Sequence, residues 1–226
     1  MKISRIILKG VNNFEDFDYS FEDAWTQSVP DSLLLLGPNG SGKTTILRSI
    51  SGLWQILGAF LDTSSPDHIG SNHNQPDFIY PTLWNCKLAL VEIENIFSNP
   101  LLICLGQQKE IEEIFSLYGN SYGLGSTWSS SKRINRYPGF QPTSIEWHYK
   151  TPDNITHEQG LWFEELRELY TKNRLGAVSN LPNMVFFESE ARNLLEIEDE
   201  FSVVPEQDIY QWQARYSATT RRQSSI

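Results

Sequence analysis

Apolar residues alternate with polar ones or cluster in short runs along the chain, and each pattern predicts an element. Residues 3–9 and 17–21 alternate as strands do, and a turn-rich connection over 10–17 separates them. Four consecutive leucines, Leu33 to Leu36, predict a strand that is buried on both faces. Apolar residues at helical spacing follow from Lys43 to about Phe60, which predicts a helix directly after this strand.

The rest of the chain holds further apolar runs and one long polar stretch. Residues 119–144 are rich in Gly and Ser and carry the basic residues Lys132, Arg133 and Arg136. A solvated loop insertion is the favoured interpretation, and a contact with nucleic acid is the alternative. The remaining predicted elements are strands over 86–96, 100–105, 144–150 and 184–187, the first two forming a hairpin, and helices over 110–117 and 161–170.

One stretch carries the pattern of a phosphate-binding loop. Residues 37–44 have the form G-x-x-x-x-G-K-[ST], between the predicted leucine strand and the predicted helix. The glycines let backbone N–H groups approach phosphate oxygens, and the start of the helix adds the positive end of its dipole. Lys43 is expected to act on the β- and γ-phosphates as the catalytic cation, and the Thr44 hydroxyl to ligate Mg²⁺. The predicted nucleotide-binding residues are Gly37, Pro38, Asn39, Gly40, Ser41, Gly42, Lys43, Thr44 and Thr45.

Composition and charge narrow the class of protein. The 226 residues are 39% hydrophobic, which is enough for a packed core. The net charge of −10 argues against binding nucleic acid through the whole surface, so a DNA contact would need a local patch. Cys86 and Cys104 lack a metal-binding or redox spacing and are expected to be buried thiols. No apolar run has the length of a membrane span, and the first residues lack a signal-peptide core, so a cytoplasmic protein without a membrane partner is expected.

The N-terminal segment resembles a known family. The opening ISRIILKGVNNFEDFDYSF, followed by LLLLGPNGSGKTTILRSISGL, is similar to the head domain of ABC-type ATPases, and within that class to the RecF, SMC and OLD-like branch. In that branch an N-terminal hairpin precedes a loop of the form G-x-N-x-[SA]-G-K-[ST]. The resemblance covers residues 1 to about 60 well and the remainder loosely. The residues that match the loop of this branch are Gly37, Asn39, Gly40, Gly42, Lys43 and Thr44.

This resemblance implies a fold, cofactors and partners. The fold is an α/β P-loop NTPase with an N-terminal antiparallel hairpin beside a mainly parallel core sheet. ATP and Mg²⁺ are the implied cofactors, and Asn39 and Thr45 add phosphate contacts. Such heads hydrolyse ATP when two of them meet around it, so a homodimer of the full-length protein is implied. The branch acts in DNA repair, chromosome maintenance or phage defence, which implies DNA and a nuclease as further partners.

A second informative stretch follows the strand predicted over 184–187, where the sequence continues with Glu188, Ser189 and Glu190. One interpretation is a Walker B strand, whose carboxylate holds Mg²⁺ through water. The other is the strand before the Q-loop of RecF- and SMC-like heads, where a polar side chain senses the γ-phosphate and the metal. The second is favoured, because no signature helix of the LSGGQ type lies between Lys43 and Glu188. Glu188 and Glu190 are therefore the predicted metal-sensing residues, in place of the glutamine that the branch uses.

The predicted organisation is the N-terminal lobe of a head over residues 1–195, followed by an acidic segment and tail over 196–226 that lead towards a helical lobe. Without a signature helix or Walker B strand, this chain alone is expected to bind ATP and not to turn it over. Two alternatives stay open. A transporter-type ATPase subunit would share the loop, although its Q-loop follows the P-loop much sooner than Glu188 does. A regulatory or scaffold module would use ATP as a switch for assembly.

Overall fold

The computed structural model divides into two compact units, Met1–Phe163 and Glu164–Ile226, and each is described by itself. Three predictions lie outside the described residues. They are the lobe boundary at residues 195–196, the metal-sensing role of Glu188 and Glu190, and the nucleic-acid contact by the basic residues at 132, 133 and 136. The structure describes residues 1–62, 81–83, 85–129, 144–153, 161–174, 181, 184–187 and 213–216.

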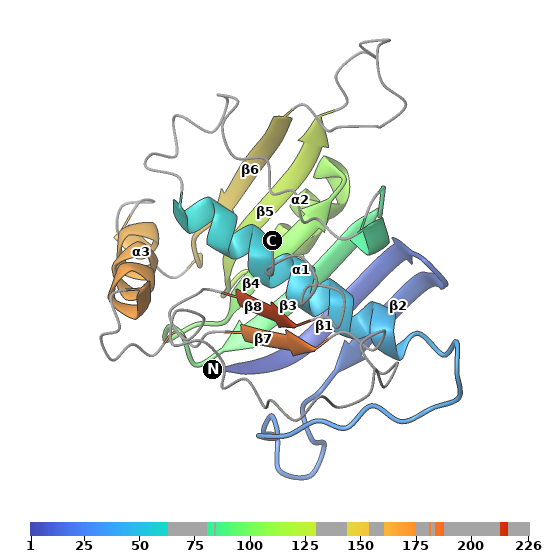
Figure 1. Ribbon diagram of the computed structural model, residues 1–226. Coiled ribbons are helices and arrows are strands. Elements are labelled where there is room, and N and C mark those ends of the chain that lie inside the picture. Colours follow the sequence, from blue (N-terminus) through green and yellow to red (C-terminus); the bar gives the residue numbers. More distant parts are fainter. Residues whose placement is uncertain are drawn as a thin grey trace, which may run out of the picture. The chain divides into compact units, whose positions relative to one another are not determined.

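A six-stranded sheet is the centre of the first unit (Figure 1). Its strands are β1 Lys2–Val11, β2 Phe14–Ser20, β3 Leu88–Glu94, β4 Leu101–Gly106, β5 Tyr122–Ser129 and β6 Ser144–Lys150. The order is β2-β1-β3-β4-β5-β6, and only the pair β4–β5 is parallel. Short turns suit antiparallel neighbours, whereas the parallel pair needs a crossover, which a helix supplies between β4 and β5. The prediction of a mainly parallel core sheet therefore fails for this sheet, while the N-terminal antiparallel hairpin is confirmed.

Helices of the first unit cover both faces of this sheet. They are α1 Lys43–Asp62 and α2 Gln108–Leu117, with a short 3-10 helix, η2, over Pro81–Leu83. On one face, Leu102 of β4 packs with Ile111 and Ile114 of α2 in a buried cluster. On the other face lies α1, whose Phe60 ring is 5.1 Å from the ring of Trp147 on β6 (Figure 1). The sheet is thus buried on both sides around β4.

Several predicted elements of the first unit are confirmed within a few residues. The helix predicted from Lys43 begins at that residue, and the predicted hairpin is formed by β3 and β4. The β1–β2 connection is much tighter than predicted, because both strands extend towards each other and leave a two-residue turn at Asn12 and Asn13. Asn12 has a φ of +48°, a conformation that asparagine tolerates better than most residues do.

The predicted leucine strand is not formed. Residues 32–38 have no strand pairing within the described part of the chain, and the side chains of Leu34 and Leu36 are 80% and 82% exposed. A continuous apolar run is buried on both faces only where strands flank it and layers cover it. The described strands of the six-stranded sheet end at β2 and β6, and neither pairs with this run. The prediction of a strand buried on both faces is wrong for the described structure.

The expectation of a surface loop over 119–144 is also wrong in part. Residues 122–129 form β5, an internal strand with buried residues, whereas β6 over 144–150 confirms the strand predicted there. The glycines of β5 serve packing, because a Cβ at Gly123 would come within 2.6 Å of the Phe115 ring and one at Gly125 within 2.7 Å of Ile111. These glycines allow α2 to approach the strand closely. By composition alone, the same residues are typical of a loop.

The second unit contains most of α3 and a two-stranded sheet. Helix α3 (Leu161–Arg174) begins in the first unit and confirms the predicted helix. Strand β7 (Met184–Phe187) confirms the predicted strand, and it pairs in parallel with β8 (Gln213–Tyr216), which lies in the stretch predicted to be a tail. Among the described helices, none combines the length and the apolar character that crossing a membrane requires.

Candidate nucleotide-binding site

The predicted phosphate-binding loop leads directly into α1. Gly40 and Gly42 have φ angles of +82° and +90°, which residues with a side chain rarely adopt. The first helical hydrogen bond is donated by the Ile46 N–H to the Gly42 carbonyl, at 2.9 Å. No acidic side chain stands in the first turn of the helix, so the positive end of its dipole is not offset by a carboxylate of that turn. The local geometry therefore suits an anion.

The ammonium of Lys43 lies inside the loop that precedes it. Its Nζ donates to the carbonyl oxygens of Gly37 and Pro38, both at 2.7 Å, and to the Ser41 hydroxyl at 3.2 Å. Gly37 approaches Ser41 closely, since a Cβ at position 37 would lie 2.8 Å from the Ser41 Oγ. The loop thus curls around the lysine, while the neighbouring Thr44 is exposed. A cation and an exposed hydroxyl stand side by side at the start of the helix.

The turn of the β1–β2 hairpin contacts this loop, a contact that the sequence patterns did not predict. A Cβ at Gly42 would come within 2.4 Å of the Phe14 ring, so this ring packs directly on the backbone of Gly42. The Asn12 amide also donates to the Thr45 hydroxyl, at 3.4 Å. Gly42 is therefore required both for its φ angle and for the space that Phe14 occupies. The dipeptide Asn12–Asn13 between two alternating runs was the available signal for a tight turn.

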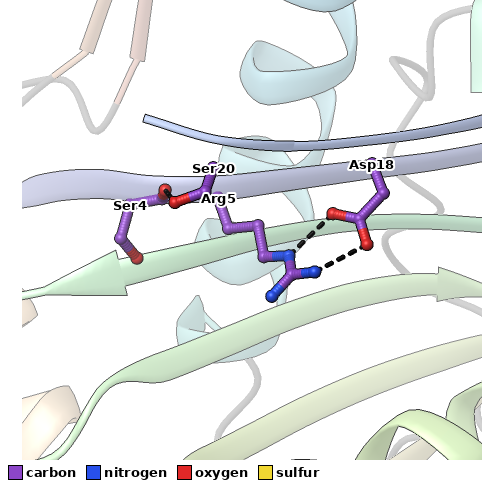
Figure 2. Close-up of polar contacts among 4 residues, drawn as sticks. All are labelled: Ser4, Arg5, Asp18 and Ser20. Carbon is purple, nitrogen blue, oxygen red and sulfur yellow. Dashed lines mark hydrogen bonds and ion pairs between the residues drawn. The ribbon is translucent and has the colours of Figure 1, made fainter. Parts of the chain in front are cut away.

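A charged pair fixes the hairpin that carries this turn. Arg5 donates from Nε and Nη2 to the two carboxylate oxygens of Asp18, at 2.7 and 2.6 Å, across β1 and β2 (Figure 2). These hydrogen bonds raise the pKa of the Arg5 guanidinium, which therefore stays charged. The guanidinium also lies 5.7 Å from the centre of the Tyr118 ring at the end of α2. The pair thus links the two strands whose turn contacts the loop.

A row of aromatic rings runs along β2 away from the loop. The ring of Phe14 lies 4.7 Å from that of Phe17, which lies 6.2 Å from Tyr19 in a stacked arrangement, and Tyr19 lies 5.2 Å from Phe21. Tyr19 is 53% exposed, whereas Phe21 is buried. In the sheet register, Phe17 and Tyr19 stand beside Leu8 and Ile6 of β1, in rows that lead to the face covered by α1. A partly exposed aromatic surface therefore begins at the loop.

The structure brings residues 37–45 together, and their predicted contacts with nucleotide and Mg²⁺ stay predictions. Two members of the set contact the hairpin: Gly42 packs against Phe14, and Thr45 accepts a hydrogen bond from Asn12. Among the described residues, no group of three His, Cys, Asp or Glu side chains is placed to hold a metal ion. The donor that the described loop offers to Mg²⁺ is the Thr44 hydroxyl, which fits a metal whose other ligands are phosphate oxygens and water.

A family model described as an AAA domain matches residues 5–211, which include β1 from Arg5 onwards, the loop and every later described strand up to β7. No solved structure matches the chain.

Proposed function

Because the chain belongs to the AAA domain family, whose members are nucleotide-binding ATPase domains, we propose that residues 37–45 bind ATP together with Mg²⁺. The observation that carries this proposal is the loop itself. Two glycines with positive φ angles lead into a helix whose first residue, Lys43, directs its ammonium back into the loop. A helix dipole and a cation thus meet at the loop, and in this proposal backbone N–H groups of the loop join them on the polyphosphate.

The loop residues have separate roles in this proposal. Lys43 now donates to loop oxygens, and phosphate oxygens of a bound nucleotide would take over part of these hydrogen bonds. The exposed Thr44 hydroxyl would ligate Mg²⁺, which offsets the charge of the phosphates when it is bound. Phe14 keeps Gly42 in place from the hairpin side. The nucleobase would lie against the rings of the partly buried Phe17 and the half-exposed Tyr19, because this aromatic surface starts at the loop.

Calorimetric titration with MgATP tests this site. We expect the wild-type protein to bind one nucleotide per chain, and Lys43→Ala to weaken binding by about 100-fold, since a charge-assisted contact with phosphate is lost. Lys109→Ala is the matched control, because Lys109 is an exposed lysine on α2 that pairs with Glu113. Equal binding by wild type and Lys43→Ala would contradict the proposal.

Inorganic tripolyphosphate separates the contributions of phosphates and base. We expect Tyr19→Ala to weaken binding of ATP about tenfold, because stacking on a base is worth roughly 1–3 kcal/mol. Binding of tripolyphosphate, which has no base, should stay unchanged. Tyr149→Ala is the control, because this tyrosine of β6 is 41% exposed and its ring lies 5.9 Å from that of Phe60, at the opposite end of α1 from the loop. Weaker binding of both ATP and tripolyphosphate by Tyr19→Ala would show that the ring supports the fold and does not contact the base.

The finer proposal is that this chain is the nucleotide-binding part of a head of the RecF, SMC or OLD-like kind. Its full-length form would dimerise around ATP and act on DNA with a nuclease partner. In support, the hairpin and loop keep the residue pattern of that branch. A single chain would then bind ATP with negligible turnover, because each head completes the site of the other. Steady-state phosphate release that Lys43→Ala abolishes, from the chain alone, would contradict this.

A further inference from the structure

The turn between β1 and β2 contacts the candidate loop at two points. The ring of Phe14 packs on Gly42, and the Asn12 amide donates to the Thr45 hydroxyl at 3.4 Å. The two residues between these points are the lysine and the threonine that are predicted to act on phosphate and Mg²⁺. One turn thus contacts both ends of the segment on which the proposed chemistry depends, although 33 positions separate Asn12 from Thr45 in the sequence.

Phe14 meets Gly42 with the tip of its ring. Relative to the position of a Cβ on Gly42, the Phe14 Cζ is the nearest ring atom, and Cε2 and Cε1 follow at 2.8 and 3.3 Å. Gly42 has a φ of +90°, and a glycine leaves such a conformation easily because no side chain restricts it. A ring packed against this glycine limits that freedom, so less conformational entropy is lost when the loop closes on a ligand.

Asn12 acts at the other end of the segment. Its φ of +48° is a conformation that asparagine tolerates, so the turn itself places the side-chain amide. A hydroxyl group has one proton to donate and two lone pairs that accept. Because the Asn12 amide donates to the Thr45 oxygen, the Thr45 proton points away from this bond and can be donated to a phosphate oxygen of a bound nucleotide.

The sheet gives the turn a fixed base from which to hold the loop. The turn follows β1, an internal strand that pairs with β2 on one side and with β3 on the other. Val11, the last residue before the turn, is fully buried. Arg5 and Asp18 further link β1 to β2 (Figure 2). The two contacts with the loop therefore come from the packed sheet of the first unit.

We propose that Asn12 and Phe14 are positioning residues for the polyphosphate, in that Phe14 restrains the backbone at Gly42 and Asn12 directs the Thr45 hydroxyl. This inference rests on the proposed binding of ATP at residues 37–45. Both residues act through the loop and do not touch the nucleotide. Their effect therefore concerns the phosphates and applies equally to a ligand without a base. By linkage, the bound nucleotide stabilises the turn as much as the turn favours the nucleotide.

Calorimetric titration of the full chain with MgATP and with tripolyphosphate tests the role of Phe14. Phe14→Ala should weaken both ligands about tenfold, because the loop loses its support. Phe14→Tyr keeps the ring but adds a hydroxyl at Cζ, the atom nearest to Gly42, and should also weaken both about tenfold. Phe14→Met, which fills the same space with a flexible apolar side chain, should weaken them less than about threefold.

Phe97→Ala is the matched control for these variants. Phe97 is a partly buried aromatic residue of the β3–β4 turn, with its ring 4.9 Å from that of Tyr122. This turn follows Glu94, which pairs with Lys2 at the start of β1, so it lies at the opposite edge of the sheet from the β1–β2 turn. Its removal should change the binding of either ligand less than about twofold.

A double-mutant cycle of Asn12→Gly and Thr45→Val tests the role of Asn12. Glycine keeps the positive φ and removes the amide. Each single variant should weaken MgATP binding about three- to fivefold, and the double variant should bind no more weakly than Thr45→Val alone, since the amide acts through the hydroxyl. Asn13→Gly, at the other position of the turn, is the control and should bind as the wild type does. Losses that add in the double variant would contradict the role of Asn12.

The outcomes separate this inference from the proposed function. If Lys43→Ala loses MgATP while Phe14→Ala and Asn12→Gly bind as the wild type does, the positioning roles are wrong and the nucleotide site stands. If the wild-type protein binds no nucleotide, the proposed function fails and the inference fails with it. Weaker binding of ATP alone by Phe14→Ala would place the ring at the base and overturn its role. Circular dichroism of every variant checks that the fold is kept.

Discussion

Two apolar runs of similar composition have opposite fates in this chain. Strand β4 has the sequence Leu-Leu-Ile-Cys-Leu-Gly and is buried at every position, whereas the run Leu33–Leu36 is largely exposed. The runs differ in their neighbours. Strand β4 lies between β3 and β5, with α1 and α2 on its two faces, and the leucine run pairs with none of the described strands. An apolar composition therefore allows a run to be buried, but pairing with strands that are distant in the sequence decides whether it is buried.

The largest expected effect compares one leucine from each run. Leu102→Ala should lower the free energy of unfolding by about 3 kcal/mol, because it leaves a cavity between β4 and α2. Leu34→Ala should change it by less than about 0.5 kcal/mol, because its side chain is already in water. Denaturant unfolding followed by circular dichroism measures both. A loss of more than about 2 kcal/mol in Leu34→Ala would mean that the leucine run is buried in solution.

A second prediction concerns the loop that follows the exposed run. Gly40 and Gly42 have similar φ angles, but a Cβ at Gly40 would meet nothing within 4 Å, while one at Gly42 would meet the Phe14 ring. Both Gly40→Ala and Gly42→Ala should lose about 1 kcal/mol to backbone strain. Gly42→Ala should lose about 1–2 kcal/mol more, owing to the clash. Adding Phe14→Leu should remove most of that difference; if it does not, Phe14 does not pack on the loop.

Sequence patterns predicted local features of this fold and missed those set by tertiary contacts. The start of α1 and the β3–β4 hairpin follow from periodicity and turn residues. The exposure of Leu33–Leu36 depends on strands far away in the sequence. The glycine content of β5 is typical of a loop in sequence, whereas in the structure these glycines make room for α2.

The candidate site shows the same division. The phosphate-binding loop was predicted from its own residues, its contacts with phosphate stay predictions, and the described backbone has the glycine conformations that such a loop requires. The contacts of Asn12 and Phe14 with Thr45 and Gly42 could not be predicted, because they depend on how the hairpin packs. Roles for Glu188 and Glu190 stay predictions, since they lie outside the described residues.

The smallest expected effect is a pH dependence of the folding stability that arises from Glu92, a partly buried residue of β3. Glu92 on β3 stands opposite Leu102 of β4, and burial raises the pKa of its carboxyl above the ordinary value of 4.5. The folded state therefore binds this proton more tightly than the unfolded state does. Stability should fall as the pH rises from about 4.5 through the raised pKa, relative to Glu92→Gln, and the difference should be constant at higher pH.

Unfolding midpoints of the wild-type protein and Glu92→Gln at a series of pH values measure this difference. Glu165→Gln, an exposed position on α3, controls for the loss of one negative charge. A difference between wild type and Glu92→Gln that does not change with pH would show that the carboxyl is solvated. The sheet would then be open to water beside β4.

Hydrogen exchange of the backbone amides, with and without MgATP, tests most directly the claim that residues 37–45 are built for a nucleotide while Leu33–Leu36 lie outside the described sheet. We expect MgATP to slow exchange at residues 40–46 by at least about tenfold, as N–H groups bond to phosphate. Exchange at residues 33–36 should stay fast with or without the nucleotide, and Lys43→Ala should abolish the protection. Unchanged exchange at residues 40–46 in saturating MgATP would show that the loop does not bind the nucleotide, and slow exchange at residues 33–36 in the free protein would show that the leucine run is paired or buried.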